Sequence, residues 1–412
     1  TKFAPETTVP FLNRGGWHDA GDNDLAAGSQ AATTHYLVLA YELSGEKTDQ
    51  TTIDFEGLNV FMHRPDGVPD FVQQIKHGAI NLLSGYRASG HSFAGIIANL
   101  EGSYLSGDWV LQTDQLFFNP ELSGNRKTTT HSGNMDDRWV FTNKDSGVEY
   151  KVAAALAAAS RSLKGYDNQL AEECIGTAKK IWDYEQANEP VAKPNAYVPR
   201  NIKLEEIIAT AELLYTTGEE KYSSHLVGLL PSIEKNFGGA AWCVSRVTDQ
   251  MKAGEFNDRF MEMLRAYKTE IDSVLALNPF GVPWKTFTWG IGWNIQQFAL
   301  EQYYLVTKYP DLFDREIVFR VVNYVLGCHP GSSTSFISGV GAHSVLSAFG
   351  MYRDMEYYIP GGNVSGTALI RPDFPELKEN TPYLWQQSEY VMPGAATYIF
   401  CVLAANNLLG IN

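Results

Sequence analysis

The chain has 412 residues, of which 44% are hydrophobic, so it is long enough to bury a large core. Its formal charge of −15 excludes nucleic acid and anionic membrane surfaces as natural partners, because both are polyanions. A neutral substrate fits this charge better, and the lack of any run of eighteen apolar residues predicts no membrane span.

Residues 15–24 read GGWHDAGDND and form the first stretch with chemical character. Three acids, Asp19, Asp22 and Asp24, lie within six residues, and the glycines around them interrupt any regular helix or strand. The stretch predicts a tight loop that presents carboxylates, although Asp-Gly pairs also occur in plain surface turns. Trp17 beside the acids is a flat side chain of the kind that sugar-binding sites use, and it favours a site.

Helical patterns follow from residue 26 to the end of the chain. Apolar positions with a period near 3.6 mark them, the 66–70 stretch (DGVPD) is expected to cap the second, and Gly218 is expected to end the fifth. We expect helices over residues 26–42, 71–86, 149–164, 168–187, 204–216, 221–237, 256–276, 293–309, 312–326 and 390–409. Consecutive antiparallel pairs without heptads or a repeat predict an all-α fold in which the pairs close into a ring.

Residues 88–147 differ from the rest, because they are rich in Gly, Ser, Thr and Asn and hold several aromatic residues. We expect long loops with short strands there, and long structured loops in a compact domain are usually functional. A ring of helix pairs leaves its loops at two ends. We therefore expect the acidic loop, the 88–147 loops and the 328–389 loops to share one end.

The cysteines and aromatic residues limit the chemistry further. Cys174, Cys243, Cys328 and Cys401 are widely spaced, which predicts buried free thiols instead of a zinc site or a disulfide framework. Aromatic residues make up 12% of the chain, which is more than a core requires and suits stacking on sugar faces. No phosphate-binding glycine loop or Ser-His-Asp pattern is present.

Several motifs together resemble glycoside hydrolase family 9, the inverting β-glycanases with an (α/α)6 barrel. GGWHDAGD at 15–22 is similar to the family's GGWYDAGD, and the Pro-Asp pair at 69–70 opens a helix as in the family. The other matching stretches, in family order, are VAAALAAASR at 152–161, ATAELLYTTGEEKY at 209–222, WGIGWN at 289–294, YVLGCHPGSSTSFISGVG at 324–341 and SEYVMPGAATYIFCVLA at 388–404. The resemblance implies one catalytic domain over residues 1–412, with long loops at its active-site end.

The chain departs from the family at three places. The family's first barrel helix precedes the acidic loop, whereas only fourteen residues do here, so the resemblance implies that this helix is missing or was cut off. The Pro-x-His-His-Arg of the cellulases is reduced to the neighbourhood of His343. Ser388 replaces the Asn that precedes the family's catalytic Glu.

By resemblance, Asp22 is the general base, Asp19 helps to hold the attacking water and Glu389 is the general acid. Inverting hydrolysis needs two carboxyl groups about 6.5–9.5 Å apart on opposite faces of the sugar. Three of the acids have a structural alternative. Asp19 could brace the loop, Glu389 could be a favourable charge at a helix N-terminus, and Asp24 could be a turn residue.

The expected substrate contacts are Trp17, Trp109, Trp139, His343 and Trp385, with His343 equally open to a structural role. Trp289 and Trp293 are further stacking candidates, and Trp293 could equally belong to the core. Asp136, Asp137 and Arg138 in the long loop could bind a sugar hydroxyl, a cation or each other, and of these we expect an Asp–Arg pair that holds the loop. No cofactor is required, and calcium is left open as a ligand of residues 121–145.

The leading functional hypothesis is a secreted or periplasmic glycoside hydrolase that cleaves β-1,4-linked glucan or a related β-glycan with inversion. An exo-acting β-glucosidase or glucosaminidase on short oligosaccharides is the alternative, which the reduced histidine motif and the 88–147 insertion favour. A non-catalytic carbohydrate-binding relative is the third reading. It is disfavoured because Asp19, Asp22 and Glu389 are all present.

Overall fold

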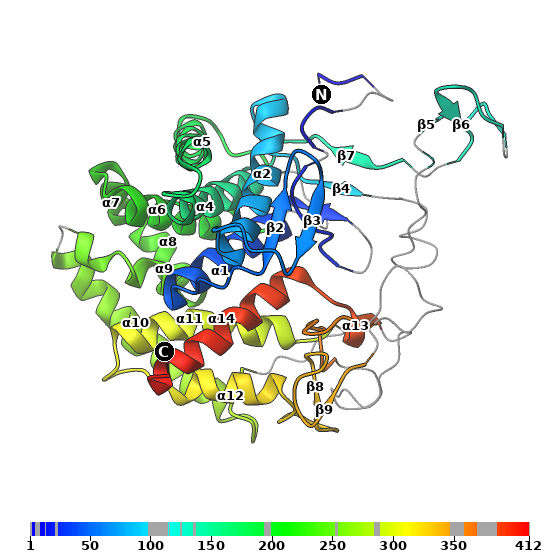
Figure 1. Cartoon of the computed structure of the whole chain (residues 1–412). Helices are drawn as coiled ribbons and strands as arrows, with labels where there is room; N and C mark the ends of the chain where they lie inside the picture. The colour runs from blue at the N-terminus through cyan, green and yellow to red at the C-terminus, as the bar shows by residue number, and fades with distance from the viewer. Residues whose placement is uncertain are drawn as a thin grey trace.

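The computed structural model describes a mostly helical chain with short strands gathered at one end (Figure 1). The described residues are 2–4, 9–12, 14–20, 24–97, 114, 116–123, 126–134, 137–192, 199–251, 254–283, 289–346, 358–368 and 385–411. Asp22 and Trp109 lie outside this part of the chain.

Among the described residues, six helices form an inner ring. Each contacts the next along the chain and the last contacts the first, so the ring is closed. The ring consists of α1 (Ala27–Ser44), α4 (Ser146–Leu163), α6 (Ile202–Thr217), α9 (Phe237–Ser245), α11 (Gly292–Lys308) and α14 (Met392–Leu409). In α4, the buried alanines from Ala153 to Ala159 allow close packing against both ring neighbours.

Outer helices lie in the intervals between successive inner helices along the sequence, which makes the fold an (α/α)6 barrel, as predicted. The interval between α6 and α9 holds two of them, and no helix precedes α1 in the described part of the chain. Its helices are α2 (Asp70–Ser89), α5 (Asn168–Ala187), α7 (Glu220–Gly228), α8 (Leu230–Lys235), α10 (Gly254–Leu275) and α12 (Glu316–Val325). Each packs on inner helices that adjoin it in sequence; α2, for example, contacts α1 and α4.

The expected helix over 221–237 is wrong, because three helices replace it. Pro231 lies in the first turn of α8, where its missing N–H is harmless, and it prevents α7 from continuing. Helix α9 then begins at Phe237 and supplies the fourth helix of the inner ring. The sequence did not predict α9, because its Gly238-Gly239 pair has low helix propensity.

Two local expectations about helix ends have different outcomes. Gly218 ends α6 with φ of 67°, as predicted. The side chains of residues 66–70 do not cap α2: its N-cap position is Pro69, and Asp70 accepts hydrogen bonds from the amides of Gln50 and Thr51 instead. Asp70 therefore ties the preceding loop to the helix.

The strands are short and lie in the loops between helices. A three-stranded antiparallel sheet has the order β1 (Leu25–Ala26), β4 (Gly95–Ile97) and β7 (Trp139–Phe141), with Leu25 opposite Ile96 and Ile96 opposite Val140. The remaining pairs are β2 (Thr51–Asp54) with β3 (Asn59–Met62), β5 (Phe117–Phe118) with β6 (His131–Ser132), and β8 (Thr334–Ser335) with β9 (His343–Ser344). The short strands within 88–147 were predicted, whereas the β2–β3 hairpin was not.

A buried ionic cluster joins the C-terminal ends of the inner helices, at the end of the barrel away from the acidic loop. Glu212 of α6 is fully buried and pairs with both Arg161 and Arg246. Burial alone would raise the pKa of Glu212, but Arg246 and Arg161 hold this pKa well below its ordinary value. Arg161 also pairs with Glu42 of α1 at 2.6 Å, so the cluster links three inner helices.

Among the described residues, α14 alone is long and apolar enough to span a membrane by length and composition. It packs against α1, α11 and α12 as the last helix of the barrel.

The cysteine prediction holds for Cys174, Cys243 and Cys401, which are buried free thiols, but Cys328 is free and exposed.

Candidate active site

The acidic loop is fixed to α2 by its two leading glycines. Gly15 and Gly16 have φ of 70° and 81°, a conformation that favours glycine. A Cβ on Gly15 would lie 2.5 Å from the His77 carbonyl oxygen. The Gly16 amide donates to that carbonyl at 3.1 Å, and His77 Nε2 lies 2.6 Å from the Gly16 oxygen. The double glycine thus lets the chain approach the helix closely enough for this exchange.

Trp17 is half-buried and held from several sides. The buried amide of Gln30 accepts from the Trp17 N–H at 2.9 Å and donates to the Trp17 carbonyl at 2.6 Å. The indole N–H donates to Gln74 at 3.0 Å, and the ring lies edge-on to His77 with centroids 5.3 Å apart. This packing fixes the loop on α1 and α2, and the role of Trp17 in sugar binding stays a prediction.

Asp19 is only 8% exposed, and hydrogen bonds hold both its main chain and its side chain. Its amide donates to the Asp24 carbonyl at 2.9 Å, which closes the loop on itself. Ser29, in the first turn of α1, donates to Asp19 Oδ2 at 3.2 Å. Asp24, which could have been a plain turn residue, is 1% exposed and thus anchors the loop in the core.

Glu389 lies between α13 (Trp385–Ser388) and α14 and is 3% exposed. Its carbonyl accepts from the Ser365 amide at 3.1 Å. The main chain of residues 289–292 binds the α13 segment and the Ser365 segment. The Gly290 amide donates to the Gln386 carbonyl at 2.8 Å, and the Gly292 amide donates to the Ser365 carbonyl at 2.9 Å. A Cβ on Gly290 would lie 2.2 Å from the Ser365 carbonyl oxygen, so the three segments require glycine to pack together.

The acidic loop and the Glu389 segment meet directly, although they come from opposite ends of the chain. The Met392 amide, in the first turn of α14, donates to the Asp19 carbonyl at 3.0 Å. Met392 follows Glu389 by three residues, so this bond places Asp19 and Glu389 on neighbouring segments. The predicted separation between the Asp22 and Glu389 carboxyl groups stays a prediction, because Asp22 is outside the described residues.

A cavity of about 370 Å³ opens beside this junction. Ser29, which binds Asp19, and Val391, which follows Glu389 by two residues, both line the cavity. The rest of the lining comes mainly from the N-terminal parts of inner helices: Ala26, Gly28, Ala32 and Tyr36 of β1 and α1, Lys151 of α4, Pro199 before α6, Trp293, Asn294 and Gln297 of α11, and Pro393, Gly394 and Thr397 of α14. The cavity therefore lies at the loop-bearing mouth of the barrel.

One wall beside the acidic loop comes from the end of the 88–147 segment. Strand β7 reaches the loop through β4 and β1, and Arg138 Nη2 lies 3.3 Å from His18 Nε2. Trp139 follows Arg138 and is 39% exposed, so its ring is available to a ligand. This contact places the end of the segment beside the acidic loop, but none of the residues that line the cavity comes from 88–147. Its role as a wall of the cleft and the sugar contact of Trp139 stay predictions.

The other predicted contacts are placed less closely. His343 is exposed in β9, where Nδ1 lies 3.4 Å from the Ser333 hydroxyl. Trp385 begins α13, four residues before Glu389, and its side chain is outside the described atoms, as is all of Trp109. Trp293 is half-buried and its ring lies against Gly394, so it both lines the cavity and packs on α14.

The sequence did not single out several polar residues that the fold brings to the cavity. Ser29, Tyr36, Lys151 and Gln297 each lie on an inner helix whose pattern predicted only a helix. Gln297 donates to Glu301, one turn further along α11, at 3.0 Å, and burial raises the pKa of Glu301 to about 8. Ser29 could have been found from the sequence, because it is a polar residue in the first two turns of the helix that follows the acidic loop.

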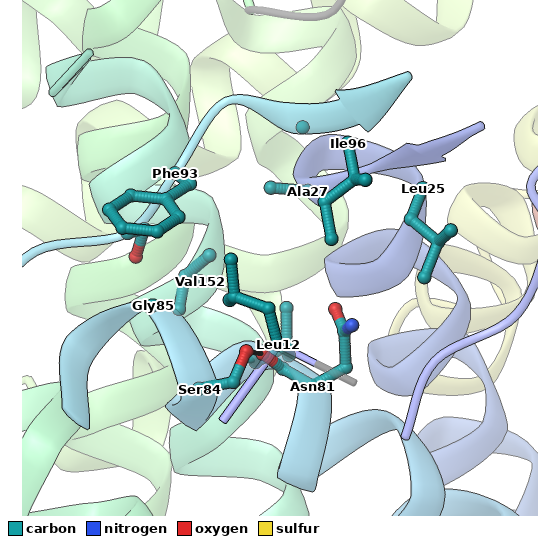
Figure 2. A pocket seen from close by; sticks show the side chains of 12 residues that line it. Leu12, Leu25, Ala27, Asn81, Ser84, Gly85, Phe93, Ile96 and Val152 are labelled. Atoms are coloured by element: carbon teal, nitrogen blue, oxygen red, sulfur yellow. Dashed lines mark hydrogen bonds between the residues drawn. The ribbon is translucent and has the colours of Figure 1, made fainter. Parts of the chain in front are cut away.

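Two other hollows do not compete with this site. The hollow in Figure 2 lies between α2, β1 and β4, is lined by residues such as Leu25 and Phe93, and holds about 30 Å³, which is room for about one water molecule. A groove of about 360 Å³ lies between the β2–β3 hairpin and α2. Neither lining includes Ser29, which binds Asp19, or Val391, which lies two residues after Glu389.

No cluster of three or more His, Cys, Asp or Glu side chains is placed to hold a metal ion in the described part of the chain. Residues 124–125 and 135–136 are outside that part, so calcium at 121–145 stays an untested expectation.

Comparison with known proteins agrees with the architecture. The sequence pattern of glycosyl hydrolase family 9 matches residues 6–352, which is most of the chain. The chain belongs to glycosyl hydrolase family 9. A curated relative, endoglucanase D of Acetivibrio thermocellus, is 23% identical over 214 residues, which span 50% of this family 9 chain and only 30% of the relative.

Solved structures of family 9 share the fold. A metagenome-derived family 9 endoglucanase superposes with a TM-score of 0.72 at 19% identity, covering 94% of this chain and 70% of that one. AaCel9A in complex with cellobiose-like isofagomine gives a TM-score of 0.73 at 16% identity, covering 95% and 75%. At these identities the likeness establishes the (α/α)6 barrel and nothing finer.

Proposed function

We propose that this chain hydrolyses β-1,4-linked glucan or a related β-glycan with inversion of configuration. Asp22 acts as general base, Asp19 helps to hold the attacking water, and Glu389 acts as general acid. The observation that carries the proposal is the hydrogen bond between the Met392 amide and the Asp19 carbonyl. It joins the two acidic segments at the rim of a cavity large enough to receive a sugar ring.

The surroundings of each acid suit its proposed task. Ser29 orients one oxygen of Asp19, so that this carboxylate can hold a water molecule for attack. Glu389 is 3% exposed, and its main chain is fixed by hydrogen bonding to Ser365. General acid–base assistance is worth about 10²–10⁴ in rate when donor and acceptor are positioned in this way.

Relatives support the substrate class. The curated relative is named as an endoglucanase, and one similar structure holds a cellobiose-like isofagomine. Because the polymer that such enzymes degrade lies outside cells, we also propose that this protein acts in a secreted or periplasmic location.

The test is kinetic and uses two variants. Glu389→Gln should lower turnover of β-glycan by at least about 10²-fold while binding is retained, because Gln keeps the shape but has no proton to donate. Asp22→Asn should do likewise by removing the base. Activated aryl glycosides or glycosyl fluorides need no protonated leaving group, so they should restore activity to the Glu389 variant and not to the Asp22 variant.

Other results would decide against parts of the proposal. Equal losses on both substrate types would remove Glu389 from the role of acid. Binding of β-glycans without wild-type turnover would favour the non-catalytic carbohydrate-binding reading.

An exo-acting enzyme on short oligosaccharides is the second candidate. It is favoured by two features of the sequence, the histidine motif reduced to the neighbourhood of His343 and the 88–147 insertion. Product analysis on β-1,4-linked oligosaccharides separates the two modes. Release of single sugars from one end supports the exo mode, and internal cleavage supports the endo mode.

A further inference from the structure

We propose that Arg138 is a positioning residue that clamps the acidic loop at His18 and Asp24 and favours the ionised form of the loop carboxylates. This inference rests on the proposed hydrolytic function, because it concerns the base side of the same site. It assigns a role to a residue in the 88–147 segment, far from the acidic loop in sequence.

The sheet brings Arg138 to the loop. Arg138 immediately precedes β7, and β7 pairs with β4, which pairs with β1. Strand β1 begins at Leu25, one residue after Asp24, and the register places Ile97 opposite Trp139. Antiparallel pairing through β4 therefore places the residues before β7 alongside the residues at the end of the acidic loop.

The guanidinium group acts on both sides of Asp19. Its Nη2 lies 3.3 Å from Nε2 of His18, the residue before Asp19. Since arginine can only donate, His18 accepts through Nε2 and is neutral in this arrangement. On the other side, burial lowers the pKa of the Arg138 guanidinium, and the negative charge of the buried Asp24 opposes this lowering. One side chain thus contacts the residue before Asp19 and interacts electrostatically with the residue that ends the loop.

The charge of Arg138 acts on the other titratable groups around His18. These groups are Asp19 and Asp24 in the loop itself and His77 from α2, which binds the Gly16 carbonyl. Burial first and Arg138 second lower the pKa of His18, which agrees with a neutral ring. The same positive charge favours the ionised form of nearby carboxylates, and a general base must be ionised.

The experiment compares Arg138→Gln and Arg138→Lys with the wild-type chain. The control is Arg126→Gln, which removes an exposed arginine from the same 88–147 segment. The pH dependence of kcat and KM is measured on a soluble β-1,4-glucan. In parallel, the pKa of His18 is followed by NMR of the histidine ring, which needs no activity.

For Arg138→Gln we expect kcat to fall about 10- to 100-fold with KM changed less than about threefold, because the base is misplaced but the sugar contacts remain. The acid limb of the pH profile should move up by about one pH unit, since a positive charge has been removed. Arg138→Lys should restore the position of this limb but only part of kcat, because it keeps the charge and loses the fork. The control should behave as wild type.

The pKa of His18 should rise in Arg138→Gln whether or not the chain hydrolyses any glycan. If wild type is inactive and the His18 pKa still rises, the proposed function fails while the clamp remains. An unchanged His18 pKa overturns the clamp itself. An increase in KM alone, with kcat and the acid limb unchanged, would overturn the positioning role and make Arg138 a sugar contact.

Discussion

Burial of the Glu301 carboxyl group should make the free energy of unfolding depend on pH. It lies on α11 one turn below Gln297, beneath the wall of the cavity, and burial raises its pKa from 4.5 to about 8. The folded chain therefore holds this proton more tightly than the unfolded chain does. The stabilisation is fully present below pH 4.5 and is lost as the pH rises through 8.

The shift of about 3.5 pH units corresponds to an upper limit of about 5 kcal/mol, at 1.36 kcal/mol per unit. The Glu301 side chain is only half-buried, so solvent screening reduces the effect and we expect about 2–3 kcal/mol. In Glu301→Gln the group can no longer ionise. The free energy of unfolding of this variant, relative to wild type, should increase by that amount between pH 5 and pH 9.

Urea unfolding of both proteins at pH 5, 7 and 9, followed by circular dichroism, measures this difference. Glu270→Gln is the matched control, since it makes the same substitution at an exposed carboxylate on α10. A Glu301→Gln difference that is constant within about 0.5 kcal/mol would refute the reasoning, because it would mean that Glu301 titrates alike in both states.

Three further predictions follow from particular contacts. Glu212→Gln should lower the free energy of unfolding by about 3–5 kcal/mol, measured in denaturant, because two buried arginines lose their counter-charge. Gly290→Ala should displace the segment that carries Glu389 and lower kcat about 10²-fold without loss of helical circular dichroism, whereas Gly176→Ala, where a Cβ meets nothing within 4 Å, should leave kcat unchanged. Trp139→Ala should raise KM about 5- to 30-fold through the loss of about 1–2 kcal/mol of ring contact; an unchanged KM would mean that no sugar reaches this ring.

The sequence predicted the elements that repeat a simple period and failed where tertiary packing decides. The helix over 168–187 was predicted to the residue, because its apolar positions and the Asp167 cap are local signals. Helix α9 was not predicted, because its Gly-Gly pair opposes a helix in isolation and only packing in the ring stabilises it. Residues 221–237 were predicted as one helix. The break between α7 and α8 was not predicted, although Pro231, in the first turn of α8, is a local signal for it.

The candidate site was predictable in kind but not in its supporting contacts. Asp19 and Glu389 were identified from motifs, and the fold brings their segments together through Met392. Ser29 and Arg138 are brought to the loop by helix packing and by pairing through β4, which no local pattern encodes. Motifs therefore reveal acids, whereas the groups that orient them depend on contacts between segments distant in sequence.

The contact between α14 and α1 also bears on how the protein is made. Because synthesis runs from the N-terminus, the ring stays open until Met392–Leu409 has been made and can pack on Ala27–Ser44. Until then, the flank of α1 that α14 covers remains exposed, and the Asp19 carbonyl has no amide of Met392 to bind. Activity should therefore arise only after Met392–Leu409 has been synthesised, and removal of this helix should leave an open, aggregation-prone chain in place of a weakened enzyme.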